Sequence, residues 1–338
     1  MGVLSIAALL VIVAFAFVLG ISDAANASAA LVASRTASYR QAMAFSFVAH
    51  AAGGLLAGEA VALTMRSLVR VPALDLPGTY LAGAVAALLF TLALTRRGVP
   101  VSASIALVGG LAGAAAADAG WQAIGWGGLH GVRPYGVLGT LLAIVVSPLV
   151  GGSAAAGLRF LLGRVMRRAS RSALTQLRGM IWLAAGLVGL ADGSNDGQKA
   201  MGLATALLVA AGSIHRFAAP FWVVAVVAIS LAAGTATGGR RIIRTVCSRF
   251  YRGGALDALA AQSASAAAIL GAAWLGAPVS TSTVVASSVI GAGAARRRRH
   301  VHWPTVRVVI SAWAFTVPAS AAMGACFVEL GRVCGVLR

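Results

Sequence analysis

The chain has 338 residues, of which 59% are hydrophobic and 10% are charged, and its mean hydropathy is +0.90. A soluble domain carries about 25% charged residues, so this composition excludes an ordinary soluble protein and indicates a polytopic helical protein in a lipid bilayer. The net charge of +19 does not indicate a nucleic-acid partner, because no basic stretch alternates with aromatic residues on a soluble element.

Apolar runs follow one another along the whole chain, and most are close to the 20 or so helical residues that cross a bilayer. The runs that open at Pro100 and Pro278 are short and contain many small residues, so we expect broken or re-entrant segments there. The spacings Gly54-x-x-x-Gly58 and Gly109-x-x-x-Gly113 predict close helix packing. In order, the runs cover residues 3–19, 41–65, 78–95, 100–118, 136–157, 179–211, 217–238, 256–276, 278–295 and 303–331.

The basic residues between these runs predict the orientation. Arginines cluster at 159–178, 240–252 and 296–299, as they do in cytoplasmic loops under the positive-inside rule. If each run crosses once, this rule predicts ten crossings with both termini outside the cytoplasm, although the pair Arg66 and Arg70 then falls outside. We therefore expect a multi-pass protein of the plasma (inner) membrane.

One stretch of the sixth run is unusually polar. ADGSNDGQKAMGLA, from Ala191 to Ala204, places two aspartates, an asparagine, a glutamine and the only lysine of the chain among apolar residues. Polar groups inside a membrane are costly, so this stretch indicates a transport or ligand site. His50 also lies within an apolar run, where it either faces a pathway or is packed and hydrogen-bonded.

Each half of the chain contains a related pair of motifs. GISDAANASAALV from Gly20 is similar to GSNDGQKAMGLAT from Gly193, and PVSASIALVGGLAGA from Pro100 is similar to PVSTSTVVASSVIGAGA from Pro278. In the orientation above, the equivalent segments run in opposite directions. This predicts an all-α polytopic membrane protein built as an inverted-topology repeat with broken or re-entrant helical segments, the architecture of secondary transporters. The expected parts are a first repeat half at 1–158, a basic cytoplasmic linker at 159–178 and a second repeat half at 179–338.

The motifs carry side chains that suit both a cation and an anion. A carboxylate in hydrocarbon needs a cation, a proton or hydrogen-bond donors, so Asp23 and Asp196 could bind sodium or accept a hydrogen bond from a protonated oxyanion. Asn26 and Asn195 would complete a sodium site. Each Pro-Val-Ser segment opens a helix whose first N–H groups, with the adjacent hydroxyls, suit a tetrahedral oxyanion. The alternatives are a polar clamp between helices for the aspartates, and N-capping with close packing for the serines.

At these residues the chain resembles the inorganic phosphate transporter (PiT) family of sodium- or proton-coupled permeases, in its bacterial form. GSNDGQKAMG and GISDAANA are similar to the two family signatures, and PVSAS and PVSTS to its PVSTT segments. The resemblance implies an inverted-repeat fold, a homodimer, and a phosphate site with cation sites beside it. It implies that phosphate is bound by Asp23, Ser102, Ser104, Asp196, Gln198, Lys199, Ser280, Thr281 and Ser282, and a cation such as sodium by Asp23, Asn26, Asn195 and Asp196.

Several residues depart from the family pattern, mostly in the first half. Ser22 replaces the asparagine of the first signature, and Asp192 stands where bacterial members commonly have histidine. Ile105 and Thr283 replace histidines that often follow the Pro-Val-Ser segments. Either a cation site in the first half is weakened or the substrate differs from phosphate. The remaining departures are Ala29, Ala30 and Ala103.

We predict import of inorganic phosphate by symport with a sodium ion or a proton, through alternating access at the repeat interface. Phosphate near pH 7 carries a proton that can be donated to a buried aspartate, whereas sulfate carries none and would be repelled by Asp23 and Asp196. The hydroxyls lost at Ala30 and Ala103 keep another oxyanion, such as sulfate, as the alternative. A second alternative is a non-transporting membrane scaffold. We expect no enzyme activity and no cofactor, because no metal-ligand cluster or activated nucleophile appears.

Overall fold

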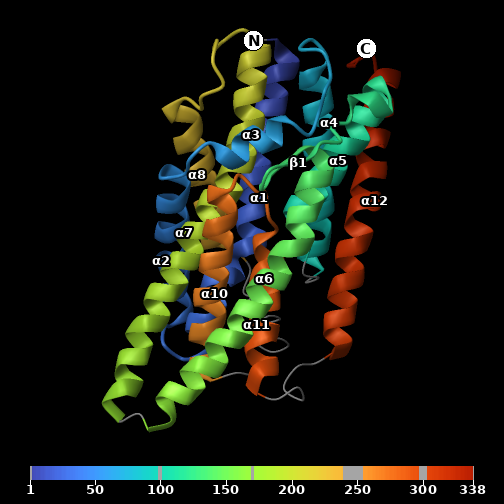
Figure 1. The fold of residues 1–338 in the computed structure, drawn as a ribbon. Helices are drawn as coiled ribbons and strands as arrows, with labels where there is room; N and C mark the ends of the chain where they lie inside the picture. Colours follow the sequence, from blue (N-terminus) through green and yellow to red (C-terminus); the bar gives the residue numbers. More distant parts are fainter. Residues whose placement is uncertain (1, 98–100, 169–170, 239–253, 297–302, 338) are drawn as a thin grey trace.

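The fold is a bundle of α-helices with one small hairpin (Figure 1). The hairpin pairs β1 (Gly128–His130) with β2 (Arg133–Tyr135), in a connection between two apolar runs where no strand was predicted. The arginine clusters at 240–252 and 297–299 lie outside the described residues, as does Pro100. The computed structural model describes residues 2–97, 101–168, 171–238, 254–296 and 303–337.

The helices fall into two sets, one that ends with α6 at Val165 and one that begins with α7 at Arg171, so much of the range expected as a linker at 159–178 is helical. Both chain ends lie at the same end of the bundle, as the loop charges predict, and the side of the membrane that they face stays a prediction (Figure 1). The first set is α1 (Val3–Ala33), α2 (Tyr39–Leu55), α3 (Ala60–Arg66), α4 (Leu76–Arg96), α5 (Ala103–Ala119) and α6 (Gly136–Val165), and the second is α7 (Arg171–Ala210), α8 (Phe221–Thr237), α10 (Ala255–Trp274), α11 (Thr281–Arg296) and α12 (Trp303–Val333).

Several helices can cross a membrane whole, and others are broken. Within the described residues, α1, α4, α6, α10 and most of α12 are long and apolar enough to span. The run expected at 41–65 is instead a broken span, because α2 and α3 meet at a 74° bend. The bend carries α3 across α7, where the amide of Gln198 accepts a hydrogen bond from the backbone N–H of Val61 (2.9 Å). The expected interruptions before α5 and α11 are present, since Ser102 and Ser280 are buried just ahead of these helices.

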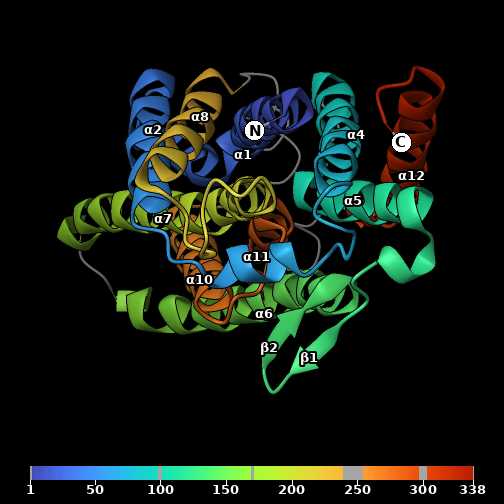
Figure 2. The ribbon, with the colours of Figure 1, turned by 90° about the horizontal axis from the view of Figure 1, so that it is seen from above.

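The helix contacts repeat between the two sets. α1 packs along α8 as α7 packs along α2, and α5 packs along α12 as α11 packs along α6. α4 contacts α1 and α5, just as α10 contacts α7 and α11. Figure 1 shows equivalent helices running in opposite directions: α6 descends toward the end opposite the termini, and α12 rises from it. The fold is therefore an inverted-topology repeat, and α11 lies near its centre when the bundle is seen from above (Figure 2).

Glycines allow the equivalent pairs to touch backbone to backbone. A Cβ at Gly113 of α5 would lie 2.0 Å from the carbonyl oxygen of Ala321 in α12. A Cβ at Gly291 of α11 would lie 2.0 Å from the carbonyl oxygen of Gly152 in α6, the equivalent crossing. The packing role expected of Gly113 is confirmed. Gly58 lies in the α2–α3 bend with nothing within 4 Å of such a Cβ, so its expected packing role was wrong.

Replacement of Gly113 by valine should destabilise the protein, because the new side chain would overlap the backbone of α12. Overpacking of this kind costs about 1–3 kcal/mol of unfolding free energy, which corresponds to a fall in melting temperature of roughly 2–10 °C. The measurement is thermal unfolding of the purified protein in detergent. Gly271→Val is the matched control, because nothing lies within 4 Å of a Cβ at Gly271. Equal melting temperatures for the two variants would contradict the close α5–α12 contact.

Candidate functional site

The two Pro-Val-Ser segments meet inside the bundle. The hydroxyl of Ser102, which precedes α5, donates to the hydroxyl of Ser280, which precedes α11, over 2.6 Å. Ser102 also accepts from the backbone N–H of Ile105 (3.2 Å) and so caps α5. Both serines are 1% exposed. The starts of two helices from opposite halves therefore lie against each other in the interior of the protein.

The two aspartates of the signatures lie at the start of α11. Asp196 of α7 accepts a hydrogen bond from the hydroxyl of Thr281 (2.9 Å), and Asp23 of α1 accepts one from the hydroxyl of Ser282 (2.7 Å). Because Thr281 and Ser282 are adjacent, one carboxylate from each half reaches the same helix end. The expected pairing of the motifs across the repeat is present in this structure.

Asp23 has one satisfied and one unsatisfied oxygen. Its Oδ1 accepts from Ser282 and from the side-chain amide of Asn26 (3.1 Å). Its Oδ2 is buried and accepts no hydrogen bond from the described residues. A buried carboxylate oxygen without a donor costs about 1–3 kcal/mol or more, so this position suits a cation or a ligand that carries a proton.

Lys199 is buried, and its donors are all used by the protein. The ammonium donates to the carboxylate of Asp196, to the backbone carbonyl of Val279 and to the hydroxyl of Ser104 (2.7 Å). An ammonium has three N–H donors, so none remains. Lys199 therefore neutralises Asp196 and ties α7 to the Pro-Val-Ser segments of both halves.

Asn195 positions the chain that leads into α11. Its amide nitrogen donates to the carbonyl of Ala277 (3.0 Å), and its amide oxygen accepts from the N–H of Val279 (3.3 Å). At the equivalent place in the first half, the hydroxyl of Ser22 donates to the carbonyl of Val101 over 3.4 Å. The serine that replaces the family asparagine thus keeps one weak contact to the same segment, and the first half holds its Pro-Val-Ser segment less firmly.

A second polar cluster adjoins the first through Asn26. The amide nitrogen of Asn26 donates to Asp23 and also to Asp192 of α7 (2.9 Å). Asp192 lies 3.7 Å from the ring nitrogen Nε2 of His50 in α2, and both side chains are 0% exposed. His50 is packed, since its Nδ1 lies 2.8 Å from the carbonyl oxygen of Ser46, and it faces a buried acid. Sequence reasoning singled out both ionisable groups within apolar runs but did not pair them.

The structure does not bring Gln198 into the cluster. Its amide oxygen accepts from Val61 at the start of α3, and its amide nitrogen donates to the hydroxyl of Ser194 (3.4 Å). No group of three or more histidine, cysteine, aspartate or glutamate side chains that could hold a metal ion occurs in the described ranges. The predicted residues that do come together are Asp23, Asn26, Ser102, Ser104, Asn195, Asp196, Lys199, Ser280, Thr281 and Ser282.

The sequence and fold have known counterparts. Residues 19–324 match the sequence profile described as "Phosphate transporter family". A Rhizobium meliloti (strain 1021) protein named "Probable low-affinity inorganic phosphate transporter" is 33% identical over 313 residues, which cover 92% of this chain and 91% of that protein. A Bacillus subtilis (strain 168) protein of the same name is 32% identical over 344 residues, with 96% and 97% covered. A solved structure, titled "The sodium-dependent phosphate transporter", is similar in fold, with a TM-score of 0.81 at 20% identity over 98% of this chain and 100% of that chain.

Proposed function

This chain belongs to the phosphate transporter family, and we propose that it imports inorganic phosphate across the plasma (inner) membrane together with a sodium ion or a proton. It is a membrane transporter and not an enzyme. One observation carries the proposal: Asp23 has a buried oxygen without a donor, and its other oxygen is bonded to Ser282 at the start of α11, next to the contact between Ser280 and Ser102. That arrangement supports binding of an anion that bears a proton.

The hydroxyls and helix starts supply donors for the oxyanion. Ser102 and Ser280 now bond to each other, and an anion between the two helix starts would replace this contact and accept from both. The free N–H groups at the start of each helix add favourable charge on both sides. A P–OH group of phosphate would donate to Oδ2 of Asp23. Sulfate lacks that proton, so its binding would leave the carboxylate facing a like charge.

The charge balance supports a coupled cation. Asp196 is neutralised by Lys199, and Asp192 lies beside His50, whereas Asp23 has no basic partner among the described residues. An anion brought next to Asp23 would add negative charge to a buried carboxylate. A sodium ion or a proton bound with the substrate would remove that cost. This supports symport, with Asp23 and Asn26 as the first ligands to test.

Each end of the bundle carries a cluster of ion pairs, and the repeat makes the two clusters equivalent. At one end Asp118 of α5 lies 3.6 Å from Arg332 of α12 and accepts from the hydroxyl of Thr79 in α4 (2.6 Å). At the other end Asp257 of α10 pairs with Arg159 of α6 and with Arg296 of α11 (3.4 Å). The first cluster joins α4 and α5 to α12, and the second joins the equivalent helices, α10 and α11, to α6. They support alternating access, in which the contacts at one end loosen while those at the other hold.

The test is uptake of labelled phosphate by purified protein in proteoliposomes, under a sodium gradient or a proton gradient. We expect uptake under one of the two gradients, little inhibition by excess sulfate, and no uptake by empty vesicles. Transport of sulfate with no phosphate uptake under either gradient would favour the alternative oxyanion. Absence of both activities would favour the scaffold. The homodimer implied by the resemblance remains a prediction, which cross-linking in the membrane can test.

A further inference from the structure

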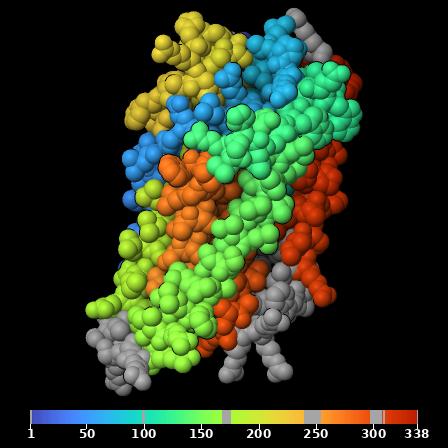
Figure 3. Space-filling view, in the orientation of Figure 1, coloured from blue at the N-terminus to red at the C-terminus, as the bar shows by residue number. Residues whose placement is uncertain are grey.

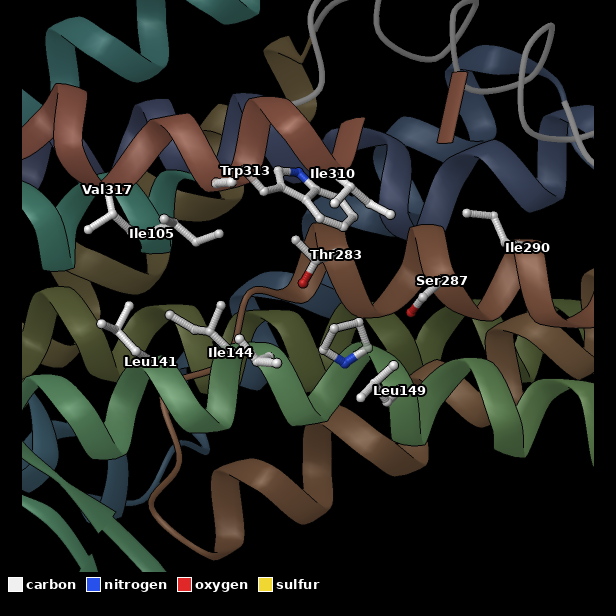
Figure 4. A pocket seen from close by; sticks show the side chains of 13 residues that line it. Ile105, Leu141, Ile144, Leu149, Thr283, Ser287, Ile290, Ile310, Trp313 and Val317 are labelled. Atoms are coloured by element: carbon white, nitrogen blue, oxygen red, sulfur yellow. The ribbon is translucent and has the colours of Figure 1, made fainter. Parts of the chain in front are cut away.

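A crevice of about 480 Å³ lies between α6 and α12. Both helices lie at the surface of the molecule, α6 in green and α12 in red (Figure 3). Figure 4 shows Leu141 and Ile144 of α6 facing Trp313 and Val317 of α12 across the crevice. Among the five helices of the described residues that are long and apolar enough to span, these two are also the least covered, with 22% and 17% of their apolar windows buried. The crevice is therefore open to the surrounding lipid.

The lining of the crevice has no free hydroxyl donor for a polar ligand. Its two hydroxyl side chains, Thr283 and Ser287 of α11, donate to the backbone carbonyls three residues before them, those of Ser280 (2.7 Å) and Val284 (2.9 Å). The remaining lining residues are apolar. An ion would lose its hydration here without compensation, so the crevice is not a path for the substrate. An apolar chain fits.

The crevice lies along the uncharged part of α12 that directly follows Arg307. Residues 308–328 include no charged residue, a run of 21 that is long enough to cross the hydrocarbon core, and the lining residues of α12 extend from Ile310 to Val317 near the start of this run. At 1.5 Å per helical residue this is roughly 10 Å of depth. Arg307 is exposed one turn before Ile310, and it lies seven residues from Ala314, another lining residue, and hence on nearly the same face of α12. The crevice thus has a cation at its interfacial end and an apolar lining below.

We propose that the crevice binds an acyl chain of an anionic phospholipid, whose headgroup phosphate is held by Arg307. A second copy of the chain fits less well, because a twofold interface on this face would bring the two copies of Arg307 toward each other. The lining also includes Ile105 and Thr283, in the first turns of α5 and α11, directly behind Ser102 and Ser280. A bound chain therefore supports the helix starts that form the candidate site.

Fluorescence of Trp313 can test the proposal without any transport assay. The protein is reconstituted in nanodiscs that contain phosphatidylglycerol or phosphatidylcholine with brominated acyl chains, and the Trp313 signal is the difference between wild type and Trp313→Phe. We expect brominated phosphatidylglycerol to quench this signal at about fivefold lower lipid fraction than brominated phosphatidylcholine, the factor that one arginine at a membrane surface supplies. Arg307→Gln should remove the preference.

The matched control moves the indole out of the crevice. In Trp313→Phe/Phe315→Trp the indole replaces Phe315, which is 67% exposed and does not line the crevice. Both lipids should quench it equally. Equal quenching of Trp313 itself by the two lipids would overturn the proposal. Weak quenching together with a cross-linked dimer that depends on Trp313 would also overturn it, because a second copy of the chain would then occupy the crevice. Because the readout is binding, a failure of phosphate uptake would not affect this result.

Discussion

Replacing Lys199 by methionine should abolish phosphate uptake and lower the stability of the fold. The ammonium is the only basic partner of Asp196 in the described part of the chain, and both side chains are 1% exposed. Removing one partner of a buried ion pair costs about 3–5 kcal/mol, because the other charge is left in a medium of low polarity. The substitution also removes the links to Ser104 and Val279, which position the starts of α5 and α11. Uptake by proteoliposomes and the melting temperature in detergent are the measurements.

A double variant separates the structural from the functional loss. In Lys199→Met/Asp196→Asn the buried charge is gone, so most of the stability should return. Uptake should stay absent, because the introduced amide could not keep both helix starts in place without the ammonium. Lys199→Arg keeps the positive charge but not the arrangement of the three donors, because a planar guanidinium cannot make the same three contacts as the ammonium. Uptake should therefore be lost in this variant too. Normal uptake by the double variant would show that Lys199 acts only on stability and would remove it from the site.

Asp23→Asn should reduce phosphate uptake about 10-fold to 100-fold and weaken its dependence on the coupling ion. The expected loss corresponds to about 1.5–3 kcal/mol for a hydrogen bond to a charged group. The amide keeps the shape of the side chain but offers a donor where Oδ2 has none. Sulfate would then no longer face a carboxylate, so excess sulfate should inhibit the residual uptake. The measurement is labelled phosphate uptake against sulfate concentration, under each gradient.

Ser282→Ala is the control for Asp23→Asn. It removes one of the two donors to Oδ1 of Asp23, keeps the donor from Asn26, and leaves the charge and Oδ2 unchanged. We expect a smaller fall in uptake and unchanged discrimination against sulfate. If Asp23→Asn keeps wild-type uptake and still excludes sulfate, the proton-bearing group of phosphate is not recognised by Asp23. The assignment of the oxyanion would then rest on the helix starts alone.

The two halves contribute unequally to the site. The second half provides Lys199 and both contacts of Asn195, whereas the first half has Ser22 in place of an asparagine and one long contact to Val101. The departures in the first signature therefore weaken a support and leave the carboxylate of Asp23 in place. We therefore expect the second half to carry more of the binding, which the variants above test.

The sequence by itself determined the membrane class, the inverted repeat and the meeting of the four motifs. Polar side chains in a bilayer have few favourable positions, so Asp23 and Asp196 had to lie in the interior with donors around them. The duplication then predicted that equivalent segments would pair across the repeat. The interruptions before Ser102 and Ser280 could be recognised because proline followed by small hydroxyl residues opens a helix.

Only the tertiary structure decided which side chains touch. Gln198 reaches Val61 because α2 and α3 bend, and His50 faces Asp192 because α2 crosses α7 at glycines. An amphipathic period identifies the buried face of a helix in a soluble protein, but these helices are apolar on nearly every side. Their rotation is set by close contacts between small residues, which the pattern of polar and apolar residues does not encode. The partners of Lys199 could therefore be found only in the folded chain.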